Sequence, residues 1–119
     1  MIEIGDILDS KRERYGTQDS DSFLRSFRIA ILRTLGDLKS SKVGLTLSYD
    51  EAFIENESLD IDSWYLGVIN DGVDHYLALE GRWGMATKVD LAAQYIRSLN
   101  EAHTRRASEV TVTTRLGAV

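Results

Sequence analysis

The chain has 119 residues and a net charge of −5, with 43% hydrophobic residues, 28% charged residues, no cysteine and no proline. This composition is typical of one soluble globular domain, and the lack of cysteine excludes a disulfide scaffold and thiol chemistry. No apolar run approaches the ~20 residues of a membrane-spanning helix, and the first residues lack the pattern of a signal peptide. The lack of proline favours long uninterrupted helices.

The first part of the chain has the spacing of two helices. Residues 2–14 predict a short amphipathic helix, whose apolar side carries Ile4, Ile7 and Leu8. A second helix should run from N-cap side chains at residues 19–21 to about residue 40. Its expected buried stripe recurs at helical spacing: Phe23, Phe27, Ile31, Leu35 and Leu38.

A strand and an acidic connection are expected next. Residues 43–49 alternate apolar with small or polar side chains, which predicts a short β element. Residues 50–62 carry six carboxylates and no basic residue, and we expect an irregular connection there.

The second part of the chain predicts an αα-hairpin. Asp62 and Ser63 can cap a third helix that runs to about residue 80, with a buried stripe of Tyr65, Ile69, Val73, Tyr76 and Leu77. Gly67 and Gly72 lower helix propensity, so we expect a neighbouring helix to approach them closely. A fourth helix should span residues 86–104, facing inward with Val89, Ala92, Ala93, Ile96 and Leu99. Aromatic anchors at the core edge or an interface are expected at the ends of the third helix: Trp64 and Trp83.

The last fifteen residues predict an extended tail. Val110, Val112, Thr114 and Leu116 alternate with polar residues, a pattern typical of a strand. Fully extended, residues 105–119 would span about 50 Å, more than the roughly 35 Å diameter expected for the body. We expect this tail to bind another chain by adding a strand, using Arg105, Arg106, Val110, Val112, Arg115 and Leu116.

Charge is unevenly distributed along the chain. Residues 43–81 hold nine acidic and no basic side chains, whereas residues 82–119 hold six basic and three acidic ones. Opposite potentials at different parts of one chain suit head-to-tail contact between identical copies. A solvated acidic loop with scattered surface charge explains the same counts.

No catalytic, cofactor or metal site is predicted. Asp71 and His75 lie four residues apart on one helix face, but two ligands do not make a metal site, and a surface pair explains them better. The acidic run lacks the spacing and central glycine of a calcium loop. No glycine-rich phosphate loop is present, and a chain with a pI of about 5.0 does not have the basic stripe of a DNA-binding module.

One arrangement resembles a known family. Asp71-Gly72-Val73 and Tyr76-Leu77, followed by a helix that holds Tyr95 between Ala92 and Leu99, are similar to motifs of the head–tail adaptor (connector) proteins of tailed bacteriophages. The resemblance covers roughly residues 20–104. This chain departs from that pattern in its long acidic connection and in Gly67.

The resemblance implies a structural virion protein rather than an enzyme. Its partners would be other copies in a ring, commonly of about twelve subunits, the portal protein, and tail-side neck or tail proteins. Genomic DNA would pass through the ring without sequence-specific binding, and no membrane would be involved. The protein would be made in the host cytoplasm and reside at the head–tail junction of the virion.

The expected fold is therefore mainly α: a bundle of about four helices with a long αα-hairpin, a β element near residues 43–49 and an extended C-terminal tail. We expect a helical domain at residues 1–104 and a docking tail at residues 105–119. Two other functions are compatible with the sequence. One is a small acidic inhibitor or antitoxin-like module that mimics a polyanion, and the other is a small enzyme or metal-binding protein that uses Asp71 and His75.

Overall fold

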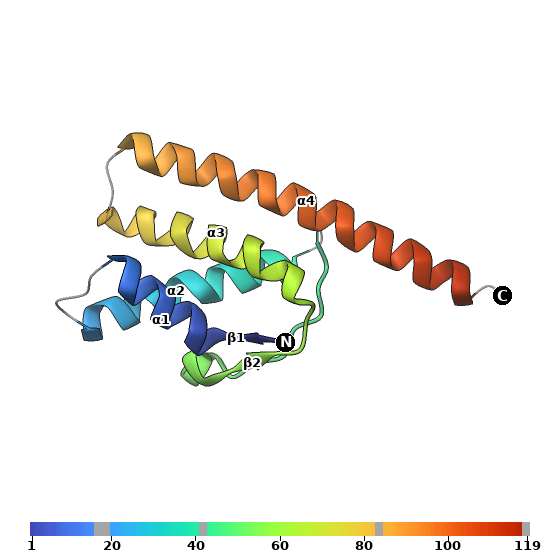
Figure 1. The fold of residues 1–119 in the computed structure, drawn as a ribbon, viewed down its shortest axis with the longest axis horizontal. Coiled ribbons are helices and arrows are strands. Elements are labelled where there is room, and N and C mark those ends of the chain that lie inside the picture. The colour runs from blue at the N-terminus through green and yellow to red at the C-terminus, as the bar shows by residue number, and fades with distance from the viewer. Residues whose placement is uncertain (16–19, 41–42, 83–84, 118–119) are drawn as a thin grey trace.

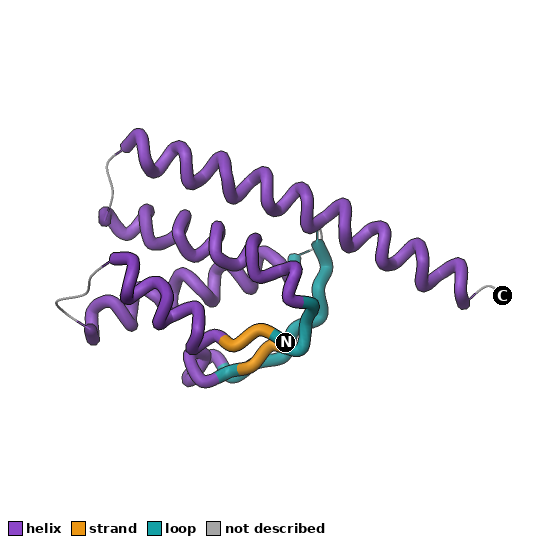
Figure 2. Tube along the Cα trace, viewed as in Figure 1, coloured by secondary structure: helices purple, strands orange, loops and turns teal. Residues whose placement is uncertain are grey.

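The computed structural model describes the backbone of residues 1–15, 20–40, 43–82 and 85–117, and the side chains of residues 1–15, 21–40, 43–80 and 87–109. The elements follow one another as β1 (Ile2–Glu3), α1 (Ile4–Tyr15), α2 (Ser20–Lys39), η1 (Glu51–Asn56), β2 (Ser58–Leu59), η2 (Ser63–Tyr65), α3 (Leu66–Leu77), η3 (Ala78–Arg82) and α4 (Met85–Gly117). The fold is mainly α, as predicted, and α3 and α4 form the expected hairpin (Figures 1 and 2).

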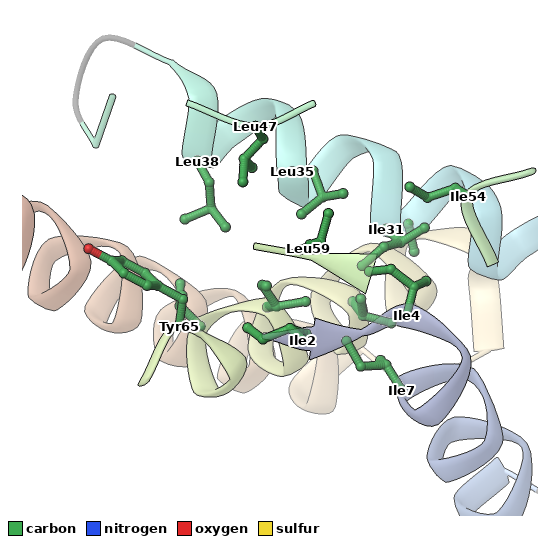
Figure 3. Packing of buried hydrophobic residues seen from close by; sticks show 14 of the residues in the cluster. Ile2, Ile4, Ile7, Ile31, Leu35, Leu38, Leu47, Ile54, Leu59 and Tyr65 are labelled. Carbon is green, nitrogen blue, oxygen red and sulfur yellow. The ribbon is translucent and has the colours of Figure 1, made fainter. Parts of the chain in front are cut away.

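The centre of the fold is the contact between α2 and α3. The predicted stripe of α2 is completely buried, and the predicted stripe of α3 is buried except for the half-buried Tyr76. Figure 3 shows isoleucine and leucine side chains from β1, α1, η1 and β2 packed over the same cluster. Helical spacing therefore identified the two helices on which the rest of the chain packs.

The connection between α2 and α3 has no strand at residues 43–49, so the predicted β element is wrong. The alternation in the sequence nevertheless corresponds to alternating burial, because Val43, Leu45 and Leu47 are buried and the residues between them are exposed. Their backbone has no partner strand in the described residues, and the segment is anchored instead by Leu45 N donating to the Leu38 carbonyl at 2.9 Å. Gly44 has a φ of 70°, which turns the chain after α2.

The two strands lie where the sequence predicted a helix and an irregular loop. Ile2 pairs with Leu59 and Glu3 with Ser58 in a short antiparallel ladder. Ile2 and Leu59 are buried beneath the ladder, and the Ser58 hydroxyl donates to the Glu3 carboxylate at 2.6 Å. This pairing closes the acidic connection over α1 and the helical core.

Helix α4 differs from the prediction in its inward face. Val89 and Ile96 are 60% and 59% exposed, and Ala93 is also exposed, so these three predicted core positions face outward. The side that packs on α3 follows a 4-3-4-3 spacing and is partly polar: Leu91, Tyr95, Ser98, Ala102, Arg105 and Glu109. Because of these polar members, an apolar stripe in the sequence does not mark this face.

The predicted extended tail is also wrong, because α4 is one helix that continues to Gly117. A strand that depends on another chain leaves its backbone groups unpaired until that chain arrives, whereas each residue added to an existing helix pairs its own N–H. The β-branched residues lower helix propensity only slightly. The predicted boundary at residue 104 therefore falls within a continuous helix, and residues 118–119 lie outside the described residues.

Gly72 lies where three helices meet. A Cβ atom at this position would lie 2.5 Å from Thr34 Cγ2 of α2 and 2.7 Å from Tyr95 Cε1 of α4. The predicted close approach is therefore confirmed at Gly72, where Thr34 and Tyr95 make it. At Gly67 the prediction was wrong, since no described atom outside its own helix lies within 4 Å of such a Cβ.

An ion pair between α1 and α3 is buried. Lys11 Nζ lies 3.0 Å from Asp74 Oδ1, and the exposed fractions of the two side chains are 5% and 7%. Arg14 reaches the other carboxylate oxygen at 3.2 Å, and the Tyr15 hydroxyl donates to Asp74 as well. Asp74 therefore holds the amphipathic first helix against the hairpin.

Candidate interaction surface

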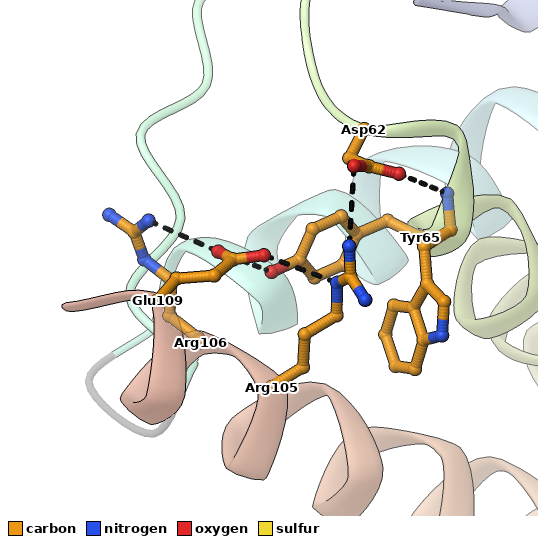
Figure 4. A network of polar contacts seen from close by, with 6 residues as sticks. Asp62, Tyr65, Arg105, Arg106 and Glu109 are labelled. Atoms are coloured by element: carbon orange, nitrogen blue, oxygen red, sulfur yellow. Dashed lines mark hydrogen bonds and ion pairs between the residues drawn. The ribbon is translucent and has the colours of Figure 1, made fainter. Parts of the chain in front are cut away.

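A polar network fixes α4 against the start of α3 (Figure 4). The Arg105 guanidinium lies 3.2 Å from the Asp62 carboxylate and 4.8 Å from the centre of the Trp64 ring. Glu109 accepts a hydrogen bond from the Tyr65 hydroxyl at 3.1 Å and lies 3.1 Å from Arg105 Nε. Asp62 also accepts from Trp64 N at 2.8 Å, so this predicted cap begins η2, the short 3-10 helix that leads into α3, rather than α3 itself.

Beyond this network, α4 projects from the body (Figure 1). Its 33 residues correspond to about 50 Å of helix, and the molecule measures 57 Å along its longest axis but only 31 and 20 Å along the others. The radius of gyration is 15.4 Å, compared with roughly 13.5 Å for a compact chain of this length. We call residues 110–117, which follow the network, the C-terminal arm.

The six predicted partner-binding residues divide into two groups. Arg105 and Arg106 contact Glu109 within the chain, at 3.1 and 3.5 Å, and Arg105 also contacts Asp62. These two arginines fix the base of the arm. The other four lie on the arm, which is helical, and a partner-binding role for them stays a prediction: Val110, Val112, Arg115 and Leu116.

A groove lies between the end of α2, α3 and α4, and we call it the α4 groove. It encloses about 500 Å³, and its apolar walls include Val43, Ile96 and Leu99. At its base, Asp37 of α2 accepts hydrogen bonds from the Tyr76 hydroxyl at 2.5 Å and the Tyr95 hydroxyl at 2.8 Å. One carboxylate thus connects three helices, and no local pattern in the sequence predicts this contact.

His75 lies in the wall of the same groove. Its ring stacks on Tyr95 at 5.5 Å, and its buried Nδ1 has no hydrogen-bond partner among the described residues. Burial lowers the pKa of His75, although the nearby Asp37 carboxylate acts in the opposite direction. A histidine with a lowered pKa is neutral near pH 7, so it adds little charge to the groove.

The tyrosines that bind these carboxylates should make the protein sensitive to alkali. Burial raises the pKa of Tyr76 to about 12, and the hydrogen bond donated to Asp37 adds to the increase; the pKa of Tyr95 is raised for the same reasons. The native state therefore keeps protons that unfolded tyrosines lose near pH ~10. The contribution of these tyrosines to the free energy of unfolding should be constant below that pH and fall as the pH rises above it.

Urea denaturation at pH values from about 9 to 12 measures this dependence. The double substitution Tyr76→Phe, Tyr95→Phe should flatten the decline, because neither ring can then lose a proton. An unchanged slope in that variant would show that other groups cause the loss of stability.

The predicted surface pair of Asp71 and His75 is not supported, because the Asp71 carboxylate binds side chains of α4 instead. Asp71 accepts from Gln94 Nε2 at 2.8 Å and from the Ser98 hydroxyl, so its carboxylate joins α3 to α4. Across the described side chains, no group of three or more histidine, cysteine, aspartate or glutamate residues could hold a metal ion.

Part of the acidic connection is neutralised within the fold. Glu55 pairs with Arg28 of α2 through two contacts, one of them Arg28 Nε to Oε2 at 2.9 Å, and this lowers the pKa of Glu55. Asp62 pairs with Arg105. The connection therefore presents fewer carboxylates to a basic partner than its sequence suggests, which weakens the interpretation as a polyanion mimic.

Three of the other acids flank an exposed aromatic residue in the sequence. Phe53 is 58% exposed and interrupts η1 with non-helical backbone angles, while the neighbouring Ile54 is completely buried. Asp50 caps η1 through Ala52 N, and Glu51 is exposed beside it. Glu57, which accepts from Asp50 N, is half-buried. We call Phe53 with Asp50, Glu51 and Glu57 the acidic knob.

No protein family, curated protein or solved structure matches this chain. Within the residues that the structure describes, no helix is both long enough and apolar enough to span a membrane.

Proposed function

We propose that this protein is a structural adaptor of a bacteriophage head–tail junction, which assembles as a ring between the portal and the tail. The observation that carries the proposal is the continuation of α4 as a helical arm beyond Glu109, which binds the Tyr65 hydroxyl. A helix that projects from a folded body offers a surface for another subunit. The resemblance of residues 20–104 to head–tail adaptors supplies the biological context.

The positions that carry the resemblance have a structural role here. Gly72 allows α2 and α4 to approach α3, and Tyr95 is 3% exposed and donates to Asp37. A rigid three-helix body with a projecting arm suits a protein that acts by position and valency. In this proposal no residue performs chemistry.

The helical arm changes the expected mode of docking. Strand addition needs an extended segment, whereas a helix binds by laying one face in a groove of its partner. The arm spans about 12 Å, which is two turns of helix. We therefore expect it to dock as a helix on the portal or on a neighbouring subunit.

Truncation after Glu109 tests this role. Because the arm begins after the network of Asp62, Tyr65 and Arg105, its removal should leave the melting temperature within about 2 °C of the full-length value. It should abolish ring particles in negative-stain images and co-purification with the portal protein of the same phage. A truncated protein that still forms rings and binds the portal would contradict the proposal.

Truncation after Thr104 is the informative comparison. It removes Arg105 and Glu109 as well as the arm, so it should lower the melting temperature in addition to abolishing assembly. The two truncations separate loss of docking from loss of folding.

A further inference from the structure

We propose that the acidic knob of one copy inserts into the α4 groove of a second copy. This inference rests on the proposed function, because it names the surfaces through which adjacent subunits of the ring would meet. It begins from two features that the intramolecular contacts leave unexplained: an exposed aromatic ring and a partly open apolar groove.

The knob is rigidly held although its ring is exposed. Ile54 is buried in the core beside Phe53, and the paired contacts between Glu55 and Arg28 fix η1 to α2. A partner therefore does not need to order this segment, which lowers the entropic cost of binding. An aromatic side chain on a preorganised element is a typical interface anchor.

The groove has the complementary character. Its apolar walls include Ile96 of α4, which is 59% exposed, and the half-buried Leu99. The Asp37 carboxylate at its base already accepts two tyrosine hydroxyls, so its charge is partly compensated. At the rim, the Arg33 guanidinium lies 5.8 Å from the centre of the Tyr76 ring.

The charges around the two surfaces are opposite in sign. Asp50, Glu51 and Glu57 flank Phe53, and residues 50–62 contain no basic side chain. Arg33 lies beside the ring of Tyr76, which lines the groove. An apolar anchor between carboxylates therefore meets an apolar groove beside a cation, and such complementarity favours this pairing over contact between two knobs.

The placement of the two surfaces determines the type of assembly. The segment η1 packs on α1 and α2, and Figure 1 shows it in green at the edge of the body opposite α4, which forms one wall of the groove. A contact between different surfaces of identical copies is heterologous, so it propagates from copy to copy. The assembly closes as a ring when the rotation from one subunit to the next is a whole-number fraction of a full turn.

Two single substitutions should each abolish the association. Phe53→Ser removes the anchor, and Ile96→Glu places a carboxylate where the acidic knob would bind; both side chains are exposed, so the fold should be retained. Sedimentation equilibrium should show the dissociation constant rising by more than about tenfold for each variant. Val89→Glu, on the same outer side of α4 and 60% exposed but outside the groove, is the matched control and should associate like the wild type.

A mixing experiment tests the pairing itself. The Phe53→Ser protein keeps an intact groove and the Ile96→Glu protein keeps an intact knob, so an equimolar mixture should form a complex that stops at two subunits. A symmetric contact through either surface alone would give no such rescue. Since the chain has no cysteine, Ala52→Cys and Asn100→Cys proteins, which keep Phe53 and Ile96, can also be mixed, and a bismaleimide should yield the heterodimer in preference to either homodimer.

Several results would overturn this inference. The first is a wild-type protein that stays monomeric at about 1 mM, a concentration at which half of the subunits would be associated even if the dissociation constant were about 1 mM. The second is undiminished association of the Phe53→Ser protein. The third is the absence of a complex in the equimolar mixture. Rings that require the arm but tolerate both substitutions would refute the knob-and-groove contact and leave the proposed function standing. Knob-and-groove association in a full-length protein that neither forms rings nor binds the portal would refute the proposed function instead.

Discussion

Replacing Asp74 with alanine should destabilise the protein by about 3–5 kcal/mol, because it leaves the buried ammonium of Lys11 without a counter-charge. The Tyr15 hydroxyl and the Arg14 guanidinium lose their acceptor in the same variant. Domains of this size have unfolding free energies of only about 5–15 kcal/mol, so this is a large fraction of the total. Urea denaturation followed by circular dichroism measures the change.

Two comparisons show whether burial causes the effect. Arg14→Ala removes a partner whose side chain is 59% exposed, and it should cost less than about 1 kcal/mol. The triple substitution Lys11→Met, Asp74→Leu, Tyr15→Phe should recover most of the stability lost in Asp74→Ala, because apolar residues can replace a buried ion pair at little cost. A cost below about 1 kcal/mol for Asp74→Ala would mean that water reaches the pair.

Gly72→Ala should also be strongly destabilising, although alanine is a better helix former than glycine. The new methyl group would lie 2.5 Å from Thr34 Cγ2 and 2.7 Å from Tyr95 Cε1, distances at which these two buried side chains must shift. Overpacking of this kind costs about 1–3 kcal/mol, which exceeds the roughly 0.5–1 kcal/mol gained in helix propensity. Because Tyr95 also donates to Asp37, the displacement should disturb that hydrogen bond as well.

Gly67→Ala and Gly36→Ala are the matched controls for this prediction. Both glycines are helical, and a methyl group added at either would meet open space. Each substitution should therefore leave stability unchanged or raise it by up to about 1 kcal/mol, again measured by urea denaturation. If Gly72→Ala left the free energy of unfolding unchanged or raised it, as expected for these two controls, the three helices would not be packed closely around Gly72.

The success of the helix predictions depended on how apolar the packing face is. In α2 the stripe from Phe23 to Leu38 is apolar at every predicted position, so periodicity located both the helix and its buried side. In α4 the packing face includes Ser98, Arg105 and Glu109, which bond to polar groups at the start and middle of α3. An apolar-stripe argument therefore predicted three exposed residues, Val89, Ala93 and Ile96, to be buried. The other two members of the predicted stripe, Ala92 and Leu99, are half-buried.

The tail shows a related limit of local patterns. Alternation over residues 110–116 satisfies the strand rule, but it takes no account of the helix that already precedes these residues. A helix extends by adding one backbone hydrogen bond per residue, whereas a strand needs a partner that its own sequence does not identify. Only two short strands form among the described residues, and each supplies the other's partner.

The sequence by itself determined the class of fold, the helical core of α2 and α3, the N-cap at Asp62 and the opposite charges of the middle and the end of the chain. These properties follow from composition and from spacing along one helix. Only the tertiary structure decided that Asp74 neutralises Lys11, that Asp37 joins Tyr76 to Tyr95, and that the knob and the groove occupy opposite edges. Each of these depends on residues distant in sequence meeting in space, and no periodicity within a single element encodes such a meeting.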